Sequence, residues 1–250
     1  MNLFEQLIWK EDRVILNNIV FRLQHYKSDN WDGGNNHIIF YKIKKLIDQY
    51  DLFFRSCGWD LKMQNVIEIG MWGGGSLVFW NEILNPQRLL GIDIIKSSDN
   101  EVFDQYISRI NLTGKKIIPC WGTDQADKPT IQKLIQTYFG KEPINMVFDD
   151  CSHMYGPTLA SFNAIFPYMA IGGLYIIEDW AWKHWITLDT GMPVQSALTN
   201  LIIDIIKATG NEGLIESVTI YEGFAVVKRG KLLIEHQDRF NLHSYILEKV

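Results

Sequence analysis

Short apolar runs alternate with amphipathic stretches along the chain between residues 65 and 210. Five apolar runs predict β-strands, at residues 65–70, 88–95, 115–122, 144–150 and 172–179. Between and after them, apolar residues recur at helical spacing and predict helices at residues 76–84, 100–111, 129–139, 158–170 and 197–210. Strands that alternate with helices are typical of a parallel, doubly wound α/β sheet.

The end of the pattern departs from that arrangement. Residues 217–230 predict an antiparallel hairpin with Glu222 and Gly223 at its turn. A mostly parallel sheet of seven strands that closes with such a hairpin is not the plain dinucleotide-binding fold. In open sheets of this kind, ligands bind beyond the carboxyl ends of the parallel strands.

The N-terminal residues have a different pattern. Residues 1–30 alternate apolar and charged positions at helical spacing, and residues 28–37 are rich in Gly, Asn and Asp. Residues 38–54 again have helical spacing. These features predict a helical N-terminal segment over residues 1–36, followed by one α/β domain over residues 37–250.

Length and composition agree with one large domain that carries a small appendage. The chain has 250 residues, 47% of them hydrophobic, which is enough for a substantial core. A net charge of −5 argues against a chain that wraps nucleic acid. The chain shows no signal-peptide pattern, no apolar run long enough to span a membrane and no CxxC pair, so we expect a cytoplasmic protein. The oligomeric state stays open, with the N-terminal helices as the candidate surface for a homo-oligomer.

A glycine-rich turn joins the first predicted strand to its helix in the stretch VIEIGMWGGGSLVFW, residues 66–80. Glycines let the backbone approach a ligand, and the start of the helix offers free N–H groups. The dinucleotide fingerprint fails because Trp72 replaces its second glycine. The phosphate loop fails because Ser76 follows Gly75 where a lysine is required. A loop without Lys or Arg, preceded by Glu68, suits a ligand with a positive centre better than a triphosphate.

Acidic residues end two of the predicted strands. Asp149 and Asp150 close one strand, and Glu178 and Asp179 close the next. If these strands are neighbours, their tips lie about 5 Å apart, and the carboxylates converge beside the glycine loop. Such a cluster raises its own pKa values unless a cation is bound, and oxygen ligands favour Mg²⁺, with Mn²⁺ or Ca²⁺ as alternatives. His153 follows at the rim, where an imidazole can accept a proton near neutral pH.

The glycine loop resembles motif I of the class I S-adenosylmethionine-dependent methyltransferases, in the form E-x-G-x-x-x-G-G-S. Asp93, at the end of the second predicted strand, matches the acidic residue that holds the ribose hydroxyls in this family. A carboxylate suits that role because it can accept two hydroxyl hydrogen bonds at once. The resemblance implies the Rossmann-like methyltransferase fold and S-adenosylmethionine as the cofactor.

The acidic strand ends resemble one branch of that family, the metal-dependent sugar O-methyltransferases of macrolide biosynthesis. The signature DDGSH … GGLYVIED is nearly reproduced by DDCSH (149–153) and GGLYIIED (172–179). The resemblance runs from about His37 to Gly230. Cys151 takes the place of a glycine, which alters the placement of His153 if that position needs a positive φ.

The resemblance implies a role for each matching residue. Asp150, Glu178 and Asp179 would bind the metal, and His153 would act beside Asp150 as the general base. The implied cofactor-binding residues are Glu68, Gly70, Gly73, Gly74, Ser76, Asp93, Asp124, Gln125 and Asp149. The metal would chelate a diol and acidify one hydroxyl, His153 would accept its proton, and the oxygen would attack the sulfonium methyl.

Residues outside these motifs give softer expectations. The aromatic loop over residues 179–193, which includes His184, is expected to line the acceptor pocket. His37 and Tyr41 precede the first strand of the sheet and are expected to close over the cofactor.

The sequence therefore predicts metal-dependent methylation of a sugar hydroxyl. A nucleotide-linked sugar for a polysaccharide and a sugar on a natural product are both open as the acceptor. A methyltransferase for a catechol or another small diol is an alternative with the same use of the metal. A non-catalytic cofactor-binding protein of the same fold is another, although a degenerate site is expected to have lost some of the residues that are present here.

Overall fold

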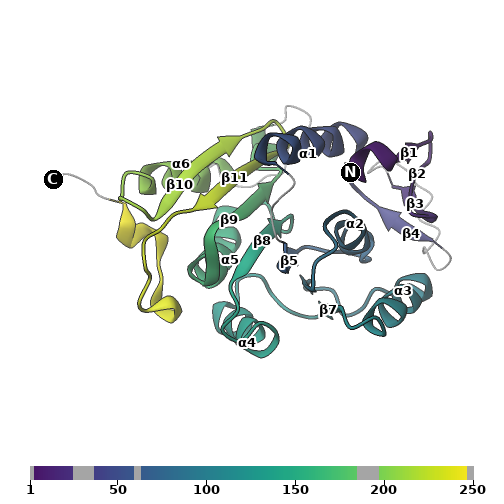
Figure 1. The fold of residues 1–250 in the computed structure, drawn as a ribbon. Helices are drawn as coiled ribbons and strands as arrows, with labels where there is room; N and C mark the ends of the chain where they lie inside the picture. Colours follow the sequence, from purple (N-terminus) through teal and green to yellow (C-terminus); the bar gives the residue numbers. More distant parts are fainter. Residues whose placement is uncertain (1–2, 25–36, 59–62, 185–196, 247–250) are drawn as a thin grey trace.

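The computed structural model describes residues 3–24, 37–58, 63–184 and 197–246, which form two β-sheets with helices packed around the larger one (Figure 1). The larger sheet has seven strands in the order β10-β11-β9-β8-β5-β6-β7. Its strands are β5 (Asn65–Ile69), β6 (Arg88–Ile92), β7 (Lys116–Cys120), β8 (Ile144–Asp149), β9 (Met169–Glu178), β10 (Ile215–Ile220) and β11 (Phe224–Arg229). Strands β5 to β9 pair in parallel, and β11 pairs antiparallel with both β9 and β10. The predicted fold class is confirmed.

Helices cover both faces of this sheet. They are α1 (Lys44–Cys57), α2 (Gly75–Leu84), α3 (Glu101–Asn111), α4 (Lys128–Tyr138), α5 (Tyr155–Ile165) and α6 (Leu198–Ala208). Alternate residues of the buried strands point to opposite faces, so Phe148 packs with α1 and α2, while Val147 packs with α4, α5 and α6. None of the described helices has the length and apolar character needed to cross a bilayer.

The N-terminal residues form strands, so the predicted helical segment is wrong for residues 3–24. After a short 3-10 turn (Leu3–Gln6), β1 (Ile8–Trp9), β2 (Arg13–Leu16) and β3 (Ile19–Leu23) form a meander that pairs in parallel with β4 (Ile38–Phe40). Asn17 and Asn18 have φ of 50° and 64°, as a two-residue hairpin turn requires, and asparagine adopts this conformation readily. The apolar residues follow the period of a strand, as buried Val14 and Leu16 show.

The predicted helix over residues 38–54 is half correct, because residues 38–40 are a strand and the helix begins at Lys44. Most of the predicted loop 28–37 lies outside the described residues. The division of the chain at residue 36 stays a prediction, although β3 and β4 join the two sides of that boundary in one sheet.

Aromatic packing fastens the small sheet to the large one. Phe21, Phe40 and Phe79 form a buried triad, with ring centroids 4.7 Å apart for Phe40 and Phe79 and 5.9 Å apart for Phe21 and Phe79. Such contacts combine area burial with favourable ring geometry. The packing sets the path of the chain from β4 to α1, and that short connection carries Lys42 into the interior.

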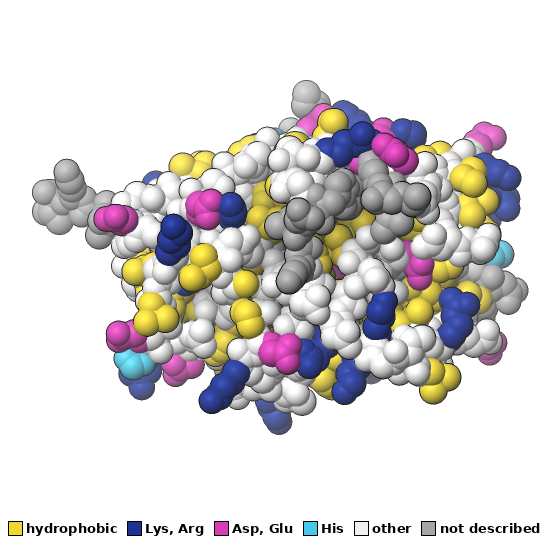
Figure 2. All heavy atoms as spheres, viewed as in Figure 1, with side chains coloured by type: hydrophobic (Ala, Val, Ile, Leu, Met, Phe, Trp, Pro, Cys, Tyr) yellow, Lys and Arg dark blue, Asp and Glu magenta, His cyan; other side chains and the backbone are white. Residues whose placement is uncertain are grey.

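Charged side chains of both signs are dispersed over the face shown in Figure 2. No single basic stripe is seen on that face, which agrees with the net charge of −5.

Gly75→Ala should detach the small sheet from α2. A Cβ at Gly75 would lie 1.7 Å from the carbonyl oxygen of Ile39, a backbone atom that cannot move aside alone. We expect the free energy of unfolding in urea to fall by about 3 kcal/mol, although alanine is the better helix former. Gly73→Ala is the matched control, because a Cβ there meets no atom within 4 Å. Equal stability of the two variants would contradict this account of the junction.

Candidate active site

The glycine loop between β5 and α2 is built by close backbone packing. Gly70 and Gly74 both have φ of 84°. A Cβ on Gly70 would lie 2.1 Å from the backbone oxygen of Asp150, and one on Gly74 would lie 2.1 Å from the ring of Phe103. These two glycines are therefore required by the fold itself. Gly73 instead borders open space, where a ligand can approach the backbone.

Glu68 lies beneath this loop and is completely buried. Neither of its carboxylate oxygens has a hydrogen-bond partner of normal distance and angle among the described residues, although the nearby hydroxyl of Ser76 acts to lower its pKa. Burial raises the pKa of Glu68 to about 8, although the ammonium of Lys42 opposes the shift. A buried carboxylate without a partner is rare in proteins and suits a cationic ligand. This observation agrees with the ligand that the sequence predicts for the loop.

Asp93 links the glycine loop to the segment after β6. Its two carboxylate oxygens accept hydrogen bonds from the backbone N–H of Trp72, at 2.7 Å, and of Ile95, at 3.0 Å. Each oxygen keeps a further lone pair, so the same carboxylate can still accept hydroxyl hydrogen bonds. Ser76 stands half-buried in the first turn of α2, beside the loop.

The other predicted cofactor-binding residues differ in burial and in their hydrogen bonds. Asp124 is exposed, and Gln125 is buried, with its Oε1 accepting a hydrogen bond from the backbone N–H of Ser152 at 3.0 Å. Asp149 is buried and accepts hydrogen bonds from the hydroxyls of Ser161 and Tyr175, both at 2.7 Å. Burial raises the pKa of Asp149 to about 6, although these two hydroxyls oppose the shift. The carboxylate of Asp149 thus already accepts hydrogen bonds within the protein, and its contact with the cofactor stays a prediction.

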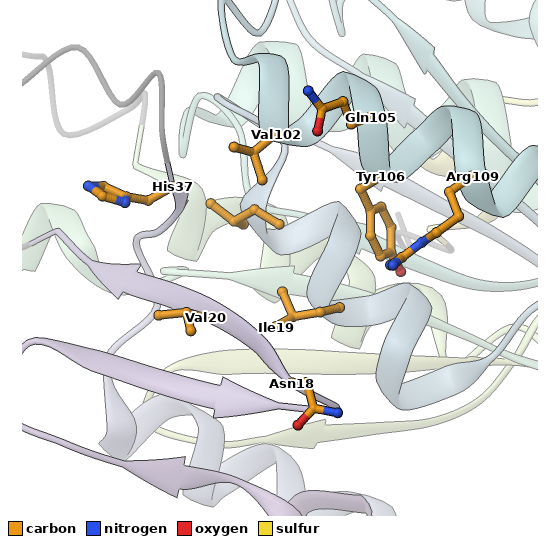
Figure 3. A pocket seen from close by; sticks show the side chains of 9 residues that line it. Asn18, Ile19, Val20, His37, Val102, Gln105, Tyr106 and Arg109 are labelled. Carbon is orange, nitrogen blue, oxygen red and sulfur yellow. The ribbon is translucent and has the colours of Figure 1, made fainter.

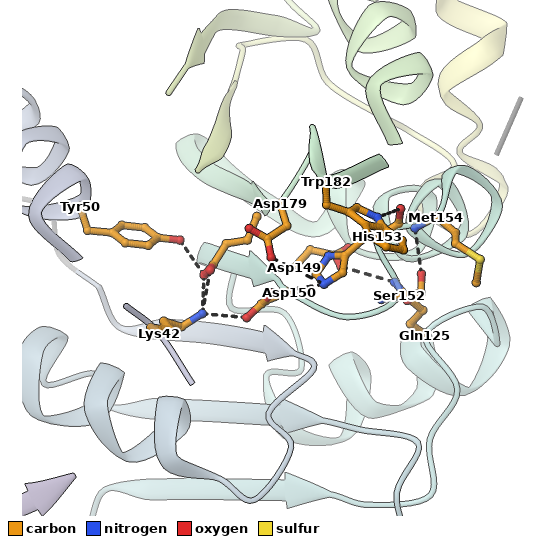
Figure 4. Close-up of polar contacts among 11 residues, drawn as sticks. Lys42, Tyr50, Gln125, Asp149, Asp150, Ser152, His153, Met154, Asp179 and Trp182 are labelled. Carbon is orange, nitrogen blue, oxygen red and sulfur yellow. Dashed lines mark hydrogen bonds and ion pairs between the residues drawn. The ribbon is translucent and has the colours of Figure 1, made fainter. Parts of the chain in front are cut away.

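The acidic strand ends meet as the sequence predicts, because β8 and β9 are neighbours. Nε2 of His153 lies 3.8 Å from Oδ1 of Asp150 and 3.9 Å from Oδ2 of Asp179 (Figure 4). One ligand atom from each of these three side chains falls within 4.8 Å of the others, a spacing that can hold a metal ion. All three are only partly buried, so the group is open to a ligand.

Two residues of this group have strained backbones. His153 and Asp179 have φ of 52° and 51°, which non-glycine residues seldom adopt. Trp182 holds the first of these turns, because its indole N–H donates to the carbonyl oxygen of His153 at 2.9 Å. Cys151 is not among the residues with positive φ, so the replacement of glycine at this position leaves the backbone unstrained there.

Lys42 is the functional residue that sequence reasoning missed. Its Nζ donates to Oδ2 of Asp150 at 2.9 Å and to the two oxygens of Glu178 at 2.7 and 2.8 Å. The hydroxyl of Tyr50, on α1, also donates to Glu178, at 2.8 Å. The lysine is only 4% exposed. Nothing in the run KIKK (42–45) distinguishes it from Lys44, because only the path of the chain after β4 sends it inward.

The side chains around Lys42 carry more negative than positive charge. Burial would lower the pKa of Lys42, but the carboxylates of Asp150, Glu178 and Glu68 raise it above its usual range. Burial and the neighbouring Asp150 raise the pKa of Glu178 to about 8, against the effect of Lys42. One ammonium thus stands among four carboxylates, those three and Asp179. The excess negative charge favours the uptake of protons or of a further cation.

The predicted residues outside the motifs lie in different parts of the structure. Tyr41 is exposed and its ring contacts that of Trp72, with 5.6 Å between centroids, so it borders the glycine loop. His37 lines a surface pocket of about 400 Å³ between the small sheet and α3 (Figure 3). His184 forms a hydrogen bond with the hydroxyl of Thr199 at 2.9 Å. Most of the aromatic loop, from residue 185 onward, lies outside the described residues.

Residues 67–180 match the family model described as a methyltransferase domain. This part of the chain is similar to methyltransferase domains. The matched range begins in β5 and ends just after β9, so it includes the glycine loop, Asp93 and all the acidic strand ends.

Curated relatives are O-methyltransferases by name. Mycinamicin VI 2''-O-methyltransferase of Micromonospora griseorubida is 32% identical over 145 residues, which cover 54% of this chain and 31% of that protein. Demethylmacrocin O-methyltransferase of Streptomyces fradiae is 33% identical over 143 residues, which cover 54% of this chain and 32% of that protein. The chain spans about a third of the length of these relatives.

A solved structure agrees with these relatives. The MycE methyltransferase from the mycinamycin biosynthetic pathway, in complex with Mg, SAH and mycinamycin VI, superposes with a TM-score of 0.57 and 27% sequence identity. The alignment covers 77% of this chain and 51% of that one. The predicted resemblance to class I methyltransferases, and among them to the macrolide sugar O-methyltransferases, is confirmed.

Glu68→Gln should remove a pH dependence of stability. The carboxyl of Glu68 loses its proton near pH 8 in the folded chain but near its ordinary value of 4.5 in the unfolded chain. The unfolded chain therefore holds fewer protons between these values, and wild-type stability falls as the pH rises from 5 to 8.5. Urea unfolding in EDTA should show a fall smaller by about 3 kcal/mol in the variant. Glu222→Gln, an exposed control, should keep the wild-type profile; a Glu68→Gln profile that also follows the wild type would argue against a buried, unpartnered carboxyl.

Proposed function

We propose that this protein is an S-adenosylmethionine-dependent, divalent-metal-dependent O-methyltransferase that acts on a sugar hydroxyl. The observation that carries the proposal is that two sites lie side by side, the glycine loop with Glu68 and the acidic strand ends with His153. Glu68, buried without a partner, lies on β5 beneath the glycine loop, and β5 pairs directly with β8, which leads into Asp150 and His153. A methyl donor with a positive centre and an acceptor held by a metal would meet across this pair of strands.

The first of these sites fits S-adenosylmethionine. The sulfonium and ammonium groups of this cofactor are cations, and Glu68 offers a buried carboxyl group beneath the loop. Gly73 leaves the loop backbone open, Ser76 offers a hydroxyl, and Asp93 keeps lone pairs for the ribose. We assign Gly70, Gly74, Asp124, Gln125 and Asp149 to the walls of the same site, on the family resemblance.

The second site fits a divalent cation, because carboxylate oxygens of Asp150 and Asp179 lie within 4.8 Å of one another. We assign Asp150, Glu178 and Asp179 to this acidic pocket. A bound Mg²⁺ would supply charge that acidifies an acceptor hydroxyl and fixes its position. The similar MycE structure contains Mg and SAH, which supports the metal. A further relative, from Streptomyces olivaceus, is named as the 2'-O-methyltransferase of an α-L-rhamnosyl tetracenomycin, which supports a sugar as the acceptor.

The residues of the chain would then divide the work. His153, at the rim of the pocket, would take the acceptor proton on Nε2, and the carboxylates of Asp150 and Asp179 would stabilise the imidazolium that forms. The hydrogen bond from Trp182 would hold the strained turn of His153 in place. We propose a saccharide as the acceptor, with a nucleotide-linked sugar of polysaccharide synthesis and a sugar of a natural product as the two forms to compare, and we place the reaction in the cytoplasm.

Titration calorimetry with S-adenosylhomocysteine tests this proposal without knowledge of the acceptor. The protein should bind it with micromolar affinity, and Asp93→Asn should weaken binding by about tenfold or more, because an amide accepts only one of the two hydroxyls well. Asp238→Asn, which removes an exposed carboxylate, controls for the same change of charge. The absence of binding to the wild type, with Mg²⁺ or with EDTA, would overturn the proposal.

His153→Ala should separate catalysis from cofactor binding. Loss of the general base should lower turnover by about 100-fold or more on any accepted sugar. The dissociation constant of S-adenosylhomocysteine should change by less than about threefold, since His153 contacts the acidic residues and not the loop. His236→Ala, an exposed residue, serves as the control. Wild-type turnover in His153→Ala would exclude the proposed base.

A further inference from the structure

The ammonium of Lys42 fills the inner side of the acidic pocket. It lies within hydrogen-bond distance of three carboxylate oxygens, two of Glu178 and one of Asp150 (Figure 4). The lysine reaches this position from outside the matched domain, on the connection between β4 and α1. A cation that belongs to the chain thus stands where the sequence predicts only a metal.

The three predicted metal ligands differ in their hydrogen bonds to Lys42 and in the exposure of their side chains. Oε1 of Glu178 accepts from both Lys42 and Tyr50, Oε2 accepts from Lys42, and the side chain is only 1% exposed. Asp150 gives only Oδ2 to Lys42, and its Oδ1 faces His153. Asp179 is the most open of the three, with 32% of its side chain exposed.

We infer that Lys42 is a built-in cation that withdraws Glu178 from the metal site. The divalent ion is then held by Asp150 through Oδ1 and by Asp179, at the opening where His153 also lies. Glu178 acts as a positioning residue, because it fixes the ammonium of Lys42, which in turn orients Asp150. This inference rests on the proposed function and corrects the set of three carboxylate ligands that the resemblance implies.

The charges agree with this division of roles. Four carboxylates, of Glu68, Asp150, Glu178 and Asp179, gather around the pocket. Lys42 supplies one positive charge, a divalent ion two, and the sulfonium of the cofactor one, so the sum is neutral. A buried cluster is stable only when its charges are balanced and hydrogen-bonded. The lysine therefore completes the site on the inner side, which a hydrated metal ion would reach only after losing its water.

Binding of Mn²⁺ alone, followed by calorimetry or by electron paramagnetic resonance, tests this inference. Asp179→Asn should weaken Mn²⁺ binding by about tenfold or more, because a charged ligand is lost. Glu178→Gln should change it by less than about fivefold, since the amide keeps the shape and Glu178 is not a ligand. Lys42→Met should tighten Mn²⁺ binding by about tenfold or more, because a repelling charge leaves and a carboxylate is freed. Lys44→Met, which removes an exposed lysine on the next turn, should match the wild type.

Each contrary result has a distinct meaning. Loss of Mn²⁺ binding in Glu178→Gln to the same extent as in Asp179→Asn would overturn the inference, and this comparison holds even if Lys42→Met does not fold. Weaker binding in a folded Lys42→Met would also overturn it. Failure of the wild type to bind Mn²⁺ would overturn it too, and binding of S-adenosylhomocysteine by the same sample would show that the cofactor part of the proposed function survives.

Discussion

The buried contact of Lys42 with Asp150 and Glu178 is the constraint around which the rest of the site is arranged. The residues of this contact come from four elements. Lys42 lies on the connection after β4, Tyr50 on α1 donates to Glu178, and Asp150 and Glu178 lie at the ends of β8 and β9. Burying these charges is costly unless each one is paired, so the elements that bear them must be held in a fixed relation. The aromatic triad of Phe21, Phe40 and Phe79 provides that fixed relation, because it locks the small sheet onto α2. The small sheet therefore supports the proposed site, although it lies outside the residues that match the methyltransferase domain model.

The parallel sheet brings the cofactor loop and the acidic pocket together at the level of single atoms. Gly70 has no side chain because the backbone of Asp150 passes where a Cβ would be. The hydrogen bond from the N–H of Asp150 to the carbonyl oxygen of Ile69, at 2.9 Å, closes the same junction. A larger residue at position 70 would push the two sites apart. The proposed transfer reaction would depend on the distance between donor and acceptor, so Gly70 would serve their positioning as well as the turn of the loop.

Much of this arrangement could be predicted from the sequence. The strands and helices from residue 65 onward follow from their apolar periodicity, and the meeting of Asp150, Glu178 and Asp179 follows from the adjacency of their strands. The small sheet could not be found in this way, because its strands are short and its charged residues also fit helical spacing. Lys42 was invisible for a different reason: its burial depends on tertiary packing between β4 and α1, and no local pattern marks it. The hydrogen bonds that Asp149 accepts likewise depend on Ser161 and Tyr175, which lie further along the chain on α5 and β9.

The position of Lys42 also bears on how such a site can work with a single divalent ion. A cluster of four carboxylates without internal cations would bind metal tightly but would hold it deep in the pocket, away from an acceptor. A fixed ammonium at the inner side neutralises part of the charge and leaves the outer carboxylates, Asp150 and Asp179, beside the imidazole of His153. The strained backbones of His153 and Asp179 fit this interpretation, since strain persists only where the surrounding contacts impose it. On the proposed function, the lysine would place the metal near His153, within reach of the hydroxyl that the metal is proposed to acidify.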